Sequence, residues 1–196
     1  VSCTRAQMVT FLWRVSGFPK ASITNPFTDV SADAYYYDAV LWAVEQGITG
    51  DTGDGKFSPD APCTRAQMAT FLWRANGSTE VTGTTPFSDV SAETYYYNAV
   101  LWAYEQNITN GTGGGKFSPN ALINREQMAV IMKNYAVKLG YTVPKALEAV
   151  TFADNASISS WAKEAVKSMQ QAGILAGKTN NRFDPAGTAT RAEVAT

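Results

Sequence analysis

Four arginines recur in one sequence context, and their side chains are the ones best suited to bind a charged ligand. Each follows a Thr or an Asn and lies two positions before a Gln or a Glu; they are Arg5, Arg65, Arg125 and Arg191. A guanidinium binds a carboxylate or a phosphate through a planar fork of N–H groups. The chain has no histidine, which excludes histidine-based triads, histidine general bases and most zinc sites. The repeated arginines are therefore candidates for anion binding.

The same context predicts that each arginine is the first residue of a helix. The cap residue and the residue three positions later form a capping box, at Thr4/Gln7, Thr64/Gln67, Asn124/Gln127 and Thr190/Glu193. A cation at this end of a helix opposes the helix dipole by about 0.3–1 kcal/mol, so capping does not require it. Two compatible explanations stay open: a structural salt bridge with the Asp of a Phe-x-Asp motif, or an anion site assisted by free helix N–H groups.

Aromatic residues form a second repeated theme. Three consecutive tyrosines occur at 35–37 and again at 95–97, and Trp42 and Trp102 occupy equivalent positions. A helix cannot bury three consecutive side chains on one face, so some of these rings must line a groove or an interface between repeats. Flat aromatic faces beside polar groups suit sugar rings, whose C–H faces are apolar and whose hydroxyls need partners. Plain packing between repeats is the alternative.

A period of 60 residues organises the chain. The motif at Phe27 recurs at Phe87, and a divergent third copy starts at Phe152. The predicted segments are the last helix of a preceding repeat at 1–17 and repeats at 27–77, 87–140 and 152–196, the last cut after its Thr-Arg-Ala-Glu motif. Because this frame begins late in one repeat and stops inside another, we expect both ends to be fragment boundaries.

Each repeat is predicted to form two helices joined by a turn-rich loop. Val40, Ala43 and Val44 share one face of a helix expected over 35–46, which Gly47 would end. The loop at 48–62 is rich in Gly, Asp, Ser and Pro, and the second helix starts after the capping box. One such pair cannot cover its own apolar face. The expected fold class is therefore mainly all-α, with tandem helix–loop–helix repeats packed into one domain.

Several other functions find little support in the sequence. The formal net charge of −1 argues against nucleic-acid binding through a broad basic face, and no run approaches the roughly 20 apolar residues of a membrane helix. The glycine-rich 111–116 lacks the spacing of a phosphate loop, and 51–55 does not match a calcium-binding EF-hand loop. No nucleophile–base pair or carboxylate pair stands out, so we expect no enzyme, cofactor or metal. A disulfide between Cys3 and Cys63 stays open.

The combination of these motifs resembles the S-layer homology family. It comprises Phe-x-Asp-Val, Gly47-Ile48-Thr49-Gly50, Gly55-Lys56-Phe57-Ser58-Pro59 and Thr64-Arg65-Ala66-Gln67, in three to four copies over nearly the whole chain. The resemblance implies a pseudo-threefold helical domain with the arginine-bearing helices at its centre. It further implies secretion to the bacterial cell surface and non-covalent anchoring to cell-wall polysaccharide, often a polymer with pyruvylated sugar, whose ketal carboxylate is an anion.

The expected ligand-binding residues combine the four arginines, the repeated aromatics and the family's loop glycines. Beyond the arginines they are Gly111, Gly177, Tyr35, Tyr95, Trp161, Trp42 and Trp102. Asp51 stands where the next repeat has Gly111, so we expect its side chain and negative charge to obstruct that loop and the sites to be unequal.

An alternative function is a protein–protein interaction or self-association module of a bacterial surface protein, built on the Tyr-rich surfaces. A separate prediction follows from the frame of the chain: the helix starting at Thr4 closes a three-repeat ring after Thr196, or it packs on a neighbouring molecule.

Overall fold

The computed structural model describes residues 4–187, and within them the chain forms six α-helices linked by long irregular segments. The helices are α1 (Arg5–Val15), α2 (Tyr37–Glu45), α3 (Arg65–Ala75), α4 (Tyr97–Glu105), α5 (Arg125–Lys138) and α6 (Lys163–Gln171). The third repeat adds two short 3-10 helices, η1 (Asn155–Ser157) and η2 (Thr179–Asn181), and strand-like pairing in residues 4–187 is limited to isolated bridges. The prediction of a mainly α-helical repeat protein is confirmed.

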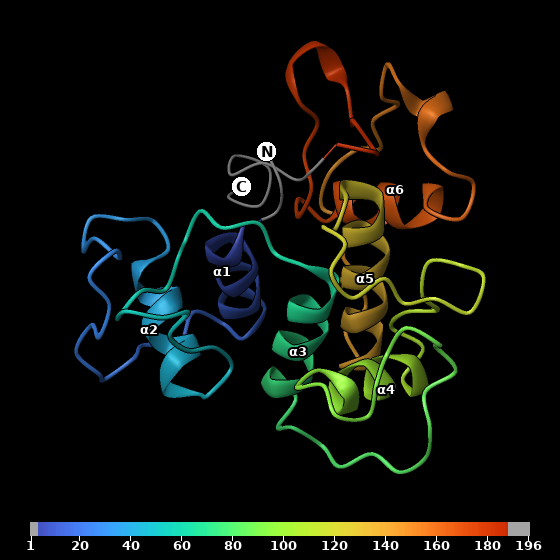
Figure 1. Cartoon of the computed structure of the whole chain (residues 1–196). Coiled ribbons are helices and arrows are strands. Elements are labelled where there is room, and N and C mark those ends of the chain that lie inside the picture. Colours follow the sequence, from blue (N-terminus) through green and yellow to red (C-terminus); the bar gives the residue numbers. More distant parts are fainter. Residues whose placement is uncertain (1–3, 188–196) are drawn as a thin grey trace.

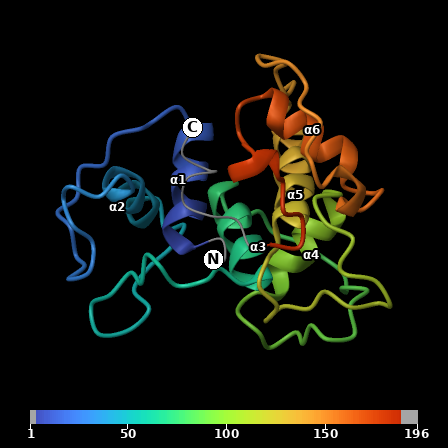
Figure 2. The same cartoon turned by 90° about the horizontal axis from the view of Figure 1, so that it is seen from above.

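Three helices form an inner row, and three lie outside it. Helices α1, α3 and α5 are neighbours in chain order, with α2, α4 and α6 on their outer sides (Figures 1 and 2). Helix α1 packs on α2, α3 on α4 and α5 on α6, and α1 also contacts α3. Since α3 ends one repeat and α4 begins the next, each packed pair joins two repeats. Successive repeats therefore share their apolar core, as expected of units that cannot bury their own faces.

The inner helices begin as the capping boxes predict. The cap side chain accepts a hydrogen bond from the backbone N–H three residues later, and the Gln there accepts one from the cap's own N–H; the pairs are Thr4/Gln7, Thr64/Gln67 and Asn124/Gln127. Cys63 and Met68, which flank the start of α3 in sequence, are both buried, in agreement with a hydrophobic staple. The box at Thr190/Glu193 and the residue Cys3 lie outside the described residues.

The outer helices begin later than expected and end where expected. Helix α2 starts at Tyr37 instead of residue 35, and the rings of Tyr35 and Tyr36 ahead of it meet edge to face at 5.0 Å. After the helix, Gly47 adopts a φ of 67°, a left-handed conformation that glycine takes without steric cost. Val40 and Ala43 are fully buried on the face that the spacing predicts.

An aspartate ties the start of each repeat to the end of its loop. The carboxylate of Asp89 accepts hydrogen bonds from the backbone N–H groups of Phe117 at 2.8 Å and Ser118 at 2.9 Å. Asp29 and Asp154 make the corresponding pairs of bonds in the other two repeats. Burial disfavours the charged form of Asp89, but these hydrogen bonds outweigh it and hold its pKa below the ordinary value. The Asp of the Phe-x-Asp motif is therefore a backbone-binding residue.

Replacing Asp89 with Asn should lower the free energy of unfolding at neutral pH and make it less sensitive to a fall in pH. A carboxylate whose pKa is lowered by folding stabilises the protein above its unfolded pKa of about 4, and this contribution is lost as the pH falls through the folded pKa. In urea titrations from neutral to acid pH, the free energy of unfolding should fall more steeply for the wild type than for Asp89→Asn. The exposed control Glu93→Gln should follow the wild type, and parallel curves for wild type and Asp89→Asn would contradict this role.

Candidate ligand-binding groove

Each motif arginine in residues 4–187 reaches from its own helix into the next repeat. Its Nε atom donates to the backbone carbonyl of a Phe, in the pairs Arg5–Phe57 at 2.9 Å, Arg65–Phe117 at 2.8 Å and Arg125–Phe183 at 2.6 Å. The guanidinium carbon also lies 4.6–4.8 Å from the centroid of the same Phe ring, where a cation is attracted to the aromatic face. All three arginines are buried. We call this contact the Arg–Phe clamp.

The clamp corrects two expectations about the arginines. Their structural partner is a carbonyl and a ring: within residues 4–187 neither Arg5 nor Arg65 forms an ion pair with a motif aspartate. The helix N–H groups are also occupied, because the backbone N–H groups of Arg65 and Ala66 donate to carbonyls of the next repeat, each at 3.0 Å, and α1 and α5 follow the same pattern. An anion at these positions must be held by the guanidinium itself.

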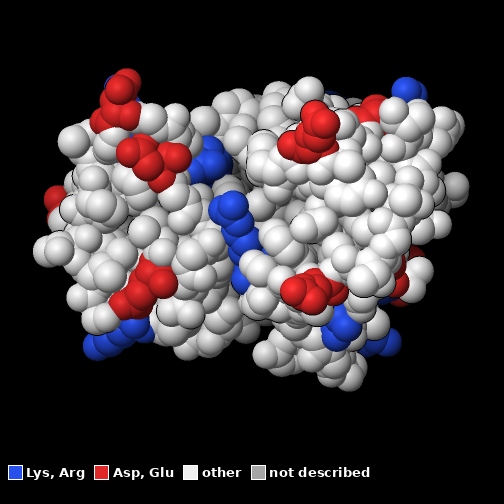
Figure 3. Space-filling model, turned by 60° about the horizontal axis from the view of Figure 1, so that its bottom comes forward, with Lys and Arg blue, Asp and Glu red and all other residues white. Residues whose placement is uncertain are grey.

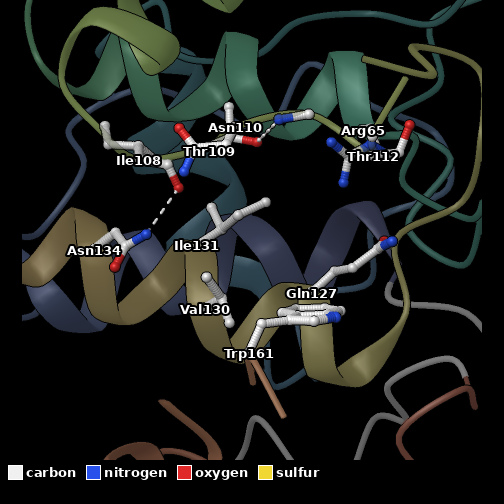
Figure 4. Close-up of a pocket in the computed structure, with 12 residues that line it drawn as sticks. Arg65, Ile108, Thr109, Asn110, Thr112, Gln127, Val130, Ile131, Asn134 and Trp161 are labelled. Atoms are coloured by element: carbon white, nitrogen blue, oxygen red, sulfur yellow. Dashed lines mark hydrogen bonds between the residues drawn. The ribbon is translucent and has the colours of Figure 1, made fainter. Parts of the chain in front are cut away.

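A groove of about 430 Å³ opens beside Arg65 and is lined by three successive repeats. Arg65 comes from the start of α3, residues 108–113 from the loop of the next repeat, and Trp161 from the segment before α6. Figure 4 shows the loop along one side, α5 along the other, and Arg65 and Asn134 toward opposite ends. Trp161 is 56% exposed, so a face of its ring is open to a ligand.

Arg65 keeps a donor that has no acceptor among the described residues. Its Nη2 atom is buried and unpartnered there, whereas Nη2 of Arg5 donates to Thr49 Oγ1 at 3.1 Å and to the carbonyl of Gly50 at 3.2 Å. Thr109, the equivalent of Thr49, accepts a bond from the N–H of Gly111 at 3.2 Å and none from Nη2 of Arg65. Burial lowers the pKa of Arg65 to about 10, so the group is still charged at neutral pH. A buried charged donor without a partner is costly, and an acceptor from a ligand would relieve that cost.

A second groove, of about 340 Å³, lies beside Arg5 and repeats the plan of the first. Tyr95, which is 64% exposed, takes the place of Trp161, and Asp51 takes the place of Gly111. The guanidinium of Arg5 lies 4.8 Å from the ring centroid of Phe57 and 5.5 Å from that of Phe71. Arg5 lines this groove, but its Nε and Nη2 donors already have partners within the protein.

Charged side chains of both signs are scattered over the face seen in Figure 3. Some Lys and Arg side chains lie in the furrow that divides this face, with Asp and Glu on both sides of it, and other Lys and Arg side chains lie near the edges of the view. Because the formal net charge is −1, attraction for an anion has to be local and cannot come from the protein as a whole.

Two predicted aromatic contacts belong to the core. Trp42 and Trp102 are 6% and 1% exposed, so protein covers their rings and we remove both from the ligand-binding set. Tyr35 is half-buried and its ring contacts Tyr36. Of the predicted aromatic residues, Trp161 and Tyr95 are the two that line a groove beside an arginine.

The two predicted glycines let their loops pack closely. Gly111 has a φ of 80°, and a Cβ there would come within 2.3 Å of the Lys116 carbonyl oxygen and 2.5 Å of the Phe87 ring. A Cβ at Gly177 would lie 2.9 Å from the Phe152 ring. Close packing therefore explains both glycines, and Gly111 also lines the Arg65 groove.

The third arginine lies outside both grooves. Arg125 is fully buried, and its Nη2 donates to the carbonyl of Ala176 at 2.8 Å. Arg191 lies outside the described residues.

Sequence reasoning missed the face of α5 that lines the Arg65 groove. It consists of residues at helical spacing: Gln127, Val130, Ile131 and Asn134. The periodicity predicts a core position for Ile131 and a capping role for Gln127, and both residues additionally border the groove. The available signal was a second polar residue on this face, Asn134, whose Nδ2 donates to the Ile108 carbonyl at 3.2 Å.

Comparison with known proteins decides the family. The sequence model of the S-layer homology domain family matches residues 26–69, 86–129 and 151–195. These residues make up more than half of the chain. The chain belongs to the S-layer homology family. Each matched segment contains one Phe-x-Asp motif and one motif arginine.

Curated relatives of this S-layer homology chain include enzymes and surface-layer proteins. The amylopullulanase of Thermoanaerobacterium thermosulfurigenes is 34% identical over 170 residues, which cover 86% of this chain and 9% of that protein. The exoglucanase XynX of Acetivibrio thermocellus is 33% identical over 181 residues, covering 92% and 16%. The S-layer protein of Bacillus thuringiensis subsp. finitimus is 31% identical over 179 residues, covering 90% and 21%. The chain thus spans less than a quarter of each relative's length.

The family and these relatives identify a cell-wall anchoring module at the cell surface. The matches to the two named enzymes cover a small part of each, so those names assign no catalysis to this chain. Among the helices of residues 4–187, none is long and apolar enough to cross a membrane.

Arg5→Met should destabilise the fold more than Arg65→Met. Both substitutions remove the Arg–Phe clamp, but only Arg5 also loses two described Nη2 hydrogen bonds. A hydrogen bond to a charged group contributes about 1.5–3 kcal/mol, so the free energies of unfolding in urea should differ by at least about 1.5 kcal/mol. Equal losses of unfolding free energy in the two variants would mean that both arginines stabilise the fold to the same extent. That result would contradict the difference in Nη2 bonding between Arg5 and Arg65.

Proposed function

We propose that this module anchors its protein by binding an acidic wall polysaccharide in the Arg65 groove. A carboxylate on the sugar, such as that of a pyruvyl ketal, would accept hydrogen bonds from the guanidinium of Arg65. The sugar ring would pack on Trp161, and its polar substituents would meet Asn110 and Asn134 at the groove wall.

The unpartnered Nη2 of Arg65 is the observation that carries this proposal. Leaving a buried donor unpaired costs about 1–3 kcal/mol, and more for a charged group; the Arg–Phe clamp accounts for Nε of Arg65 but gives its Nη2 no acceptor. The groove volume of about 430 Å³ falls in the range of small-molecule sites. The exposed ring of Trp161 adds the apolar platform that a sugar face needs.

Arg65→Gln should weaken binding to purified wall polysaccharide by about tenfold or more, because a charge-assisted hydrogen bond is lost. Cosedimentation with cell walls and calorimetric titration of soluble polysaccharide fragments would measure the effect. Lys138→Gln removes one positive charge from an exposed position of α5 and should bind like the wild type. Unchanged binding by folded Arg65→Gln would exclude this role of the arginine.

Trp161→Ala should weaken the same interaction while leaving the fold intact, since the ring is more than half exposed. The matched control Tyr104→Ala removes a partly exposed ring, which packs on Phe87, from outside the residues that line the groove. Retention on walls from which the polysaccharide has been extracted would support a protein-binding module in place of the polysaccharide anchor.

A further inference from the structure

A buried acidic residue at the start of α5 has no counterpart in the other two inner helices. It is Glu126, and the equivalent residues of α1 and α3 are Ala6 and Ala66. Glu126 is 8% exposed, and its carboxylate accepts hydrogen bonds from the backbone N–H of Ser159 at 2.9 Å and from the Ser159 hydroxyl at 3.0 Å. Burying a carboxylate costs free energy, and alanine is sufficient for the helix in two copies. Helix formation therefore does not explain this residue.

Ser159 begins the turn that carries Trp161 into α6. Its carbonyl accepts a hydrogen bond from the backbone N–H of Ala162 at 2.9 Å, and Trp161 lies inside this turn and lines the Arg65 groove. Glu126 itself lies outside the residues that line the groove. Because α5 forms one side of the groove (Figure 4), the bonds between Glu126 and Ser159 fix the backbone of Trp161 relative to that side.

The equivalent ring of the preceding repeat is held in a different way. Tyr95 packs edge to face on Tyr96, and the two ring centroids are 5.1 Å apart. In the third repeat the residue equivalent to Tyr96 is Ala162, and among the described residues no aromatic ring packs on Trp161. The copy that loses this neighbouring ring is the one that gains Glu126. The hydrogen-bonded tether therefore replaces the missing ring as the support of the exposed aromatic residue.

We propose that Glu126 is a positioning residue of the Arg65 groove, which through Ser159 holds the Trp161 ring where a sugar packs on it. The proposal rests on the proposed function for the ligand, an acidic wall polysaccharide. Trp161 is 56% exposed, so much of its order has to come from the backbone that carries it. Holding the ring in place before the ligand arrives reduces the entropy lost on binding. Glu126 therefore raises the affinity without contacting the ligand.

The negative charge of Glu126 by itself would have the opposite effect on affinity. A carboxylate near an anion site repels the ligand, so removal of its charge alone should strengthen the binding of an acidic polymer. Loss of the tether should weaken it. Glutamine separates the two effects, because it removes the charge and keeps both bonds: its amide oxygen can accept from the Ser159 N–H, and its amide N–H can donate to the Ser159 hydroxyl oxygen.

Calorimetric titration with fragments of wall polysaccharide tests the tether. Glu126→Ala, which copies the other inner helices, should weaken binding by about two- to tenfold, as expected when one side chain has to be immobilised on binding. Glu126→Gln should bind at least as tightly as the wild type. Glu164→Ala is the matched control, because it also removes a carboxylate and a contact between the same repeats, the ion pair with Lys133, and it should bind like the wild type.

Two outcomes of this titration would overturn the proposal. One is wild-type affinity in folded Glu126→Ala, and the other is an equal loss of affinity in Glu126→Ala and Glu126→Gln. Ser159→Ala removes only the bond from the hydroxyl and leaves the carboxylate its backbone partner, so it serves if Glu126→Ala does not fold. This variant should show a smaller loss of affinity in the same direction, and wild-type affinity would count against the tether.

Two further measurements show whether Glu126 acts through Trp161. In the Trp161→Ala background, Glu126→Ala should cause no further loss of affinity, whereas the same loss in both backgrounds would overturn the proposal. Nitrogen-15 relaxation of the Trp161 indole N–H in the free protein should give a lower order parameter in Glu126→Ala and an unchanged one in Glu126→Gln.

The order parameter also separates this proposal from the proposed function. Wild-type affinity in Trp161→Ala would contradict the sugar platform of the proposed function. A lower order parameter in Glu126→Ala would then still support Glu126 as the residue that holds the ring, and an unchanged one would overturn that role.

Discussion

The Arg–Phe clamp is the contact on which the rest of the structure depends. Burying a guanidinium costs free energy because the charge loses its contact with water. Here a hydrogen bond to the carbonyl of one Phe in the next repeat, and contact with the ring of that Phe, offset the cost. The separation between Arg and Phe is 52 residues in the first two clamps and 58 in the third. Because the same geometry survives six additional residues, the clamp, and not the length of the connection, fixes where one repeat sits on the next.

The third repeat depends on additional polar contacts to hold its place on α5. Glu126, which replaces the Ala66 of the preceding repeat, is buried and accepts hydrogen bonds from the backbone N–H and the hydroxyl of Ser159 at 2.9 and 3.0 Å. The ion pair of Lys133 with Glu164 at 3.3 Å spans the same two repeats, but Glu164 is largely exposed and such pairs add little stability. Glu126 is therefore the stronger attachment, and it anchors the segment that carries Trp161 only two residues after Ser159.

The sequence predicts features that depend on residues close together in the chain, and it misses features that form only when the repeats pack together. The capping boxes, the stop at Gly47 and the apolar faces around Val40 depend on neighbours within a few residues, so residue types and spacing are sufficient to find them. The role of Arg65 depends on a carbonyl 52 residues away, which no local pattern contains. The burial of Trp102 depends on the segments that pack over α4. The groove itself forms only where three repeats meet. Resemblance to a family supplied the ligand class, but it could not distinguish Arg5 from Arg65.

One consequence of the clamp is that the same arginine serves the fold and faces the ligand. Nε is committed to the next repeat in all three described copies, so only the Nη groups can differ between grooves. The residues around the Nη groups do differ. Thr49 accepts a hydrogen bond from Arg5, whereas its equivalent Thr109 accepts one from the N–H of Gly111. Residue 74 is a charged Arg, and the equivalent residue 134 is a neutral Asn. Duplicated repeats that cannot lose their arginine without loosening the core are left to diverge through the residues around it. In such an array, differences in ligand binding should be sought in this surrounding shell and not in the shared motif.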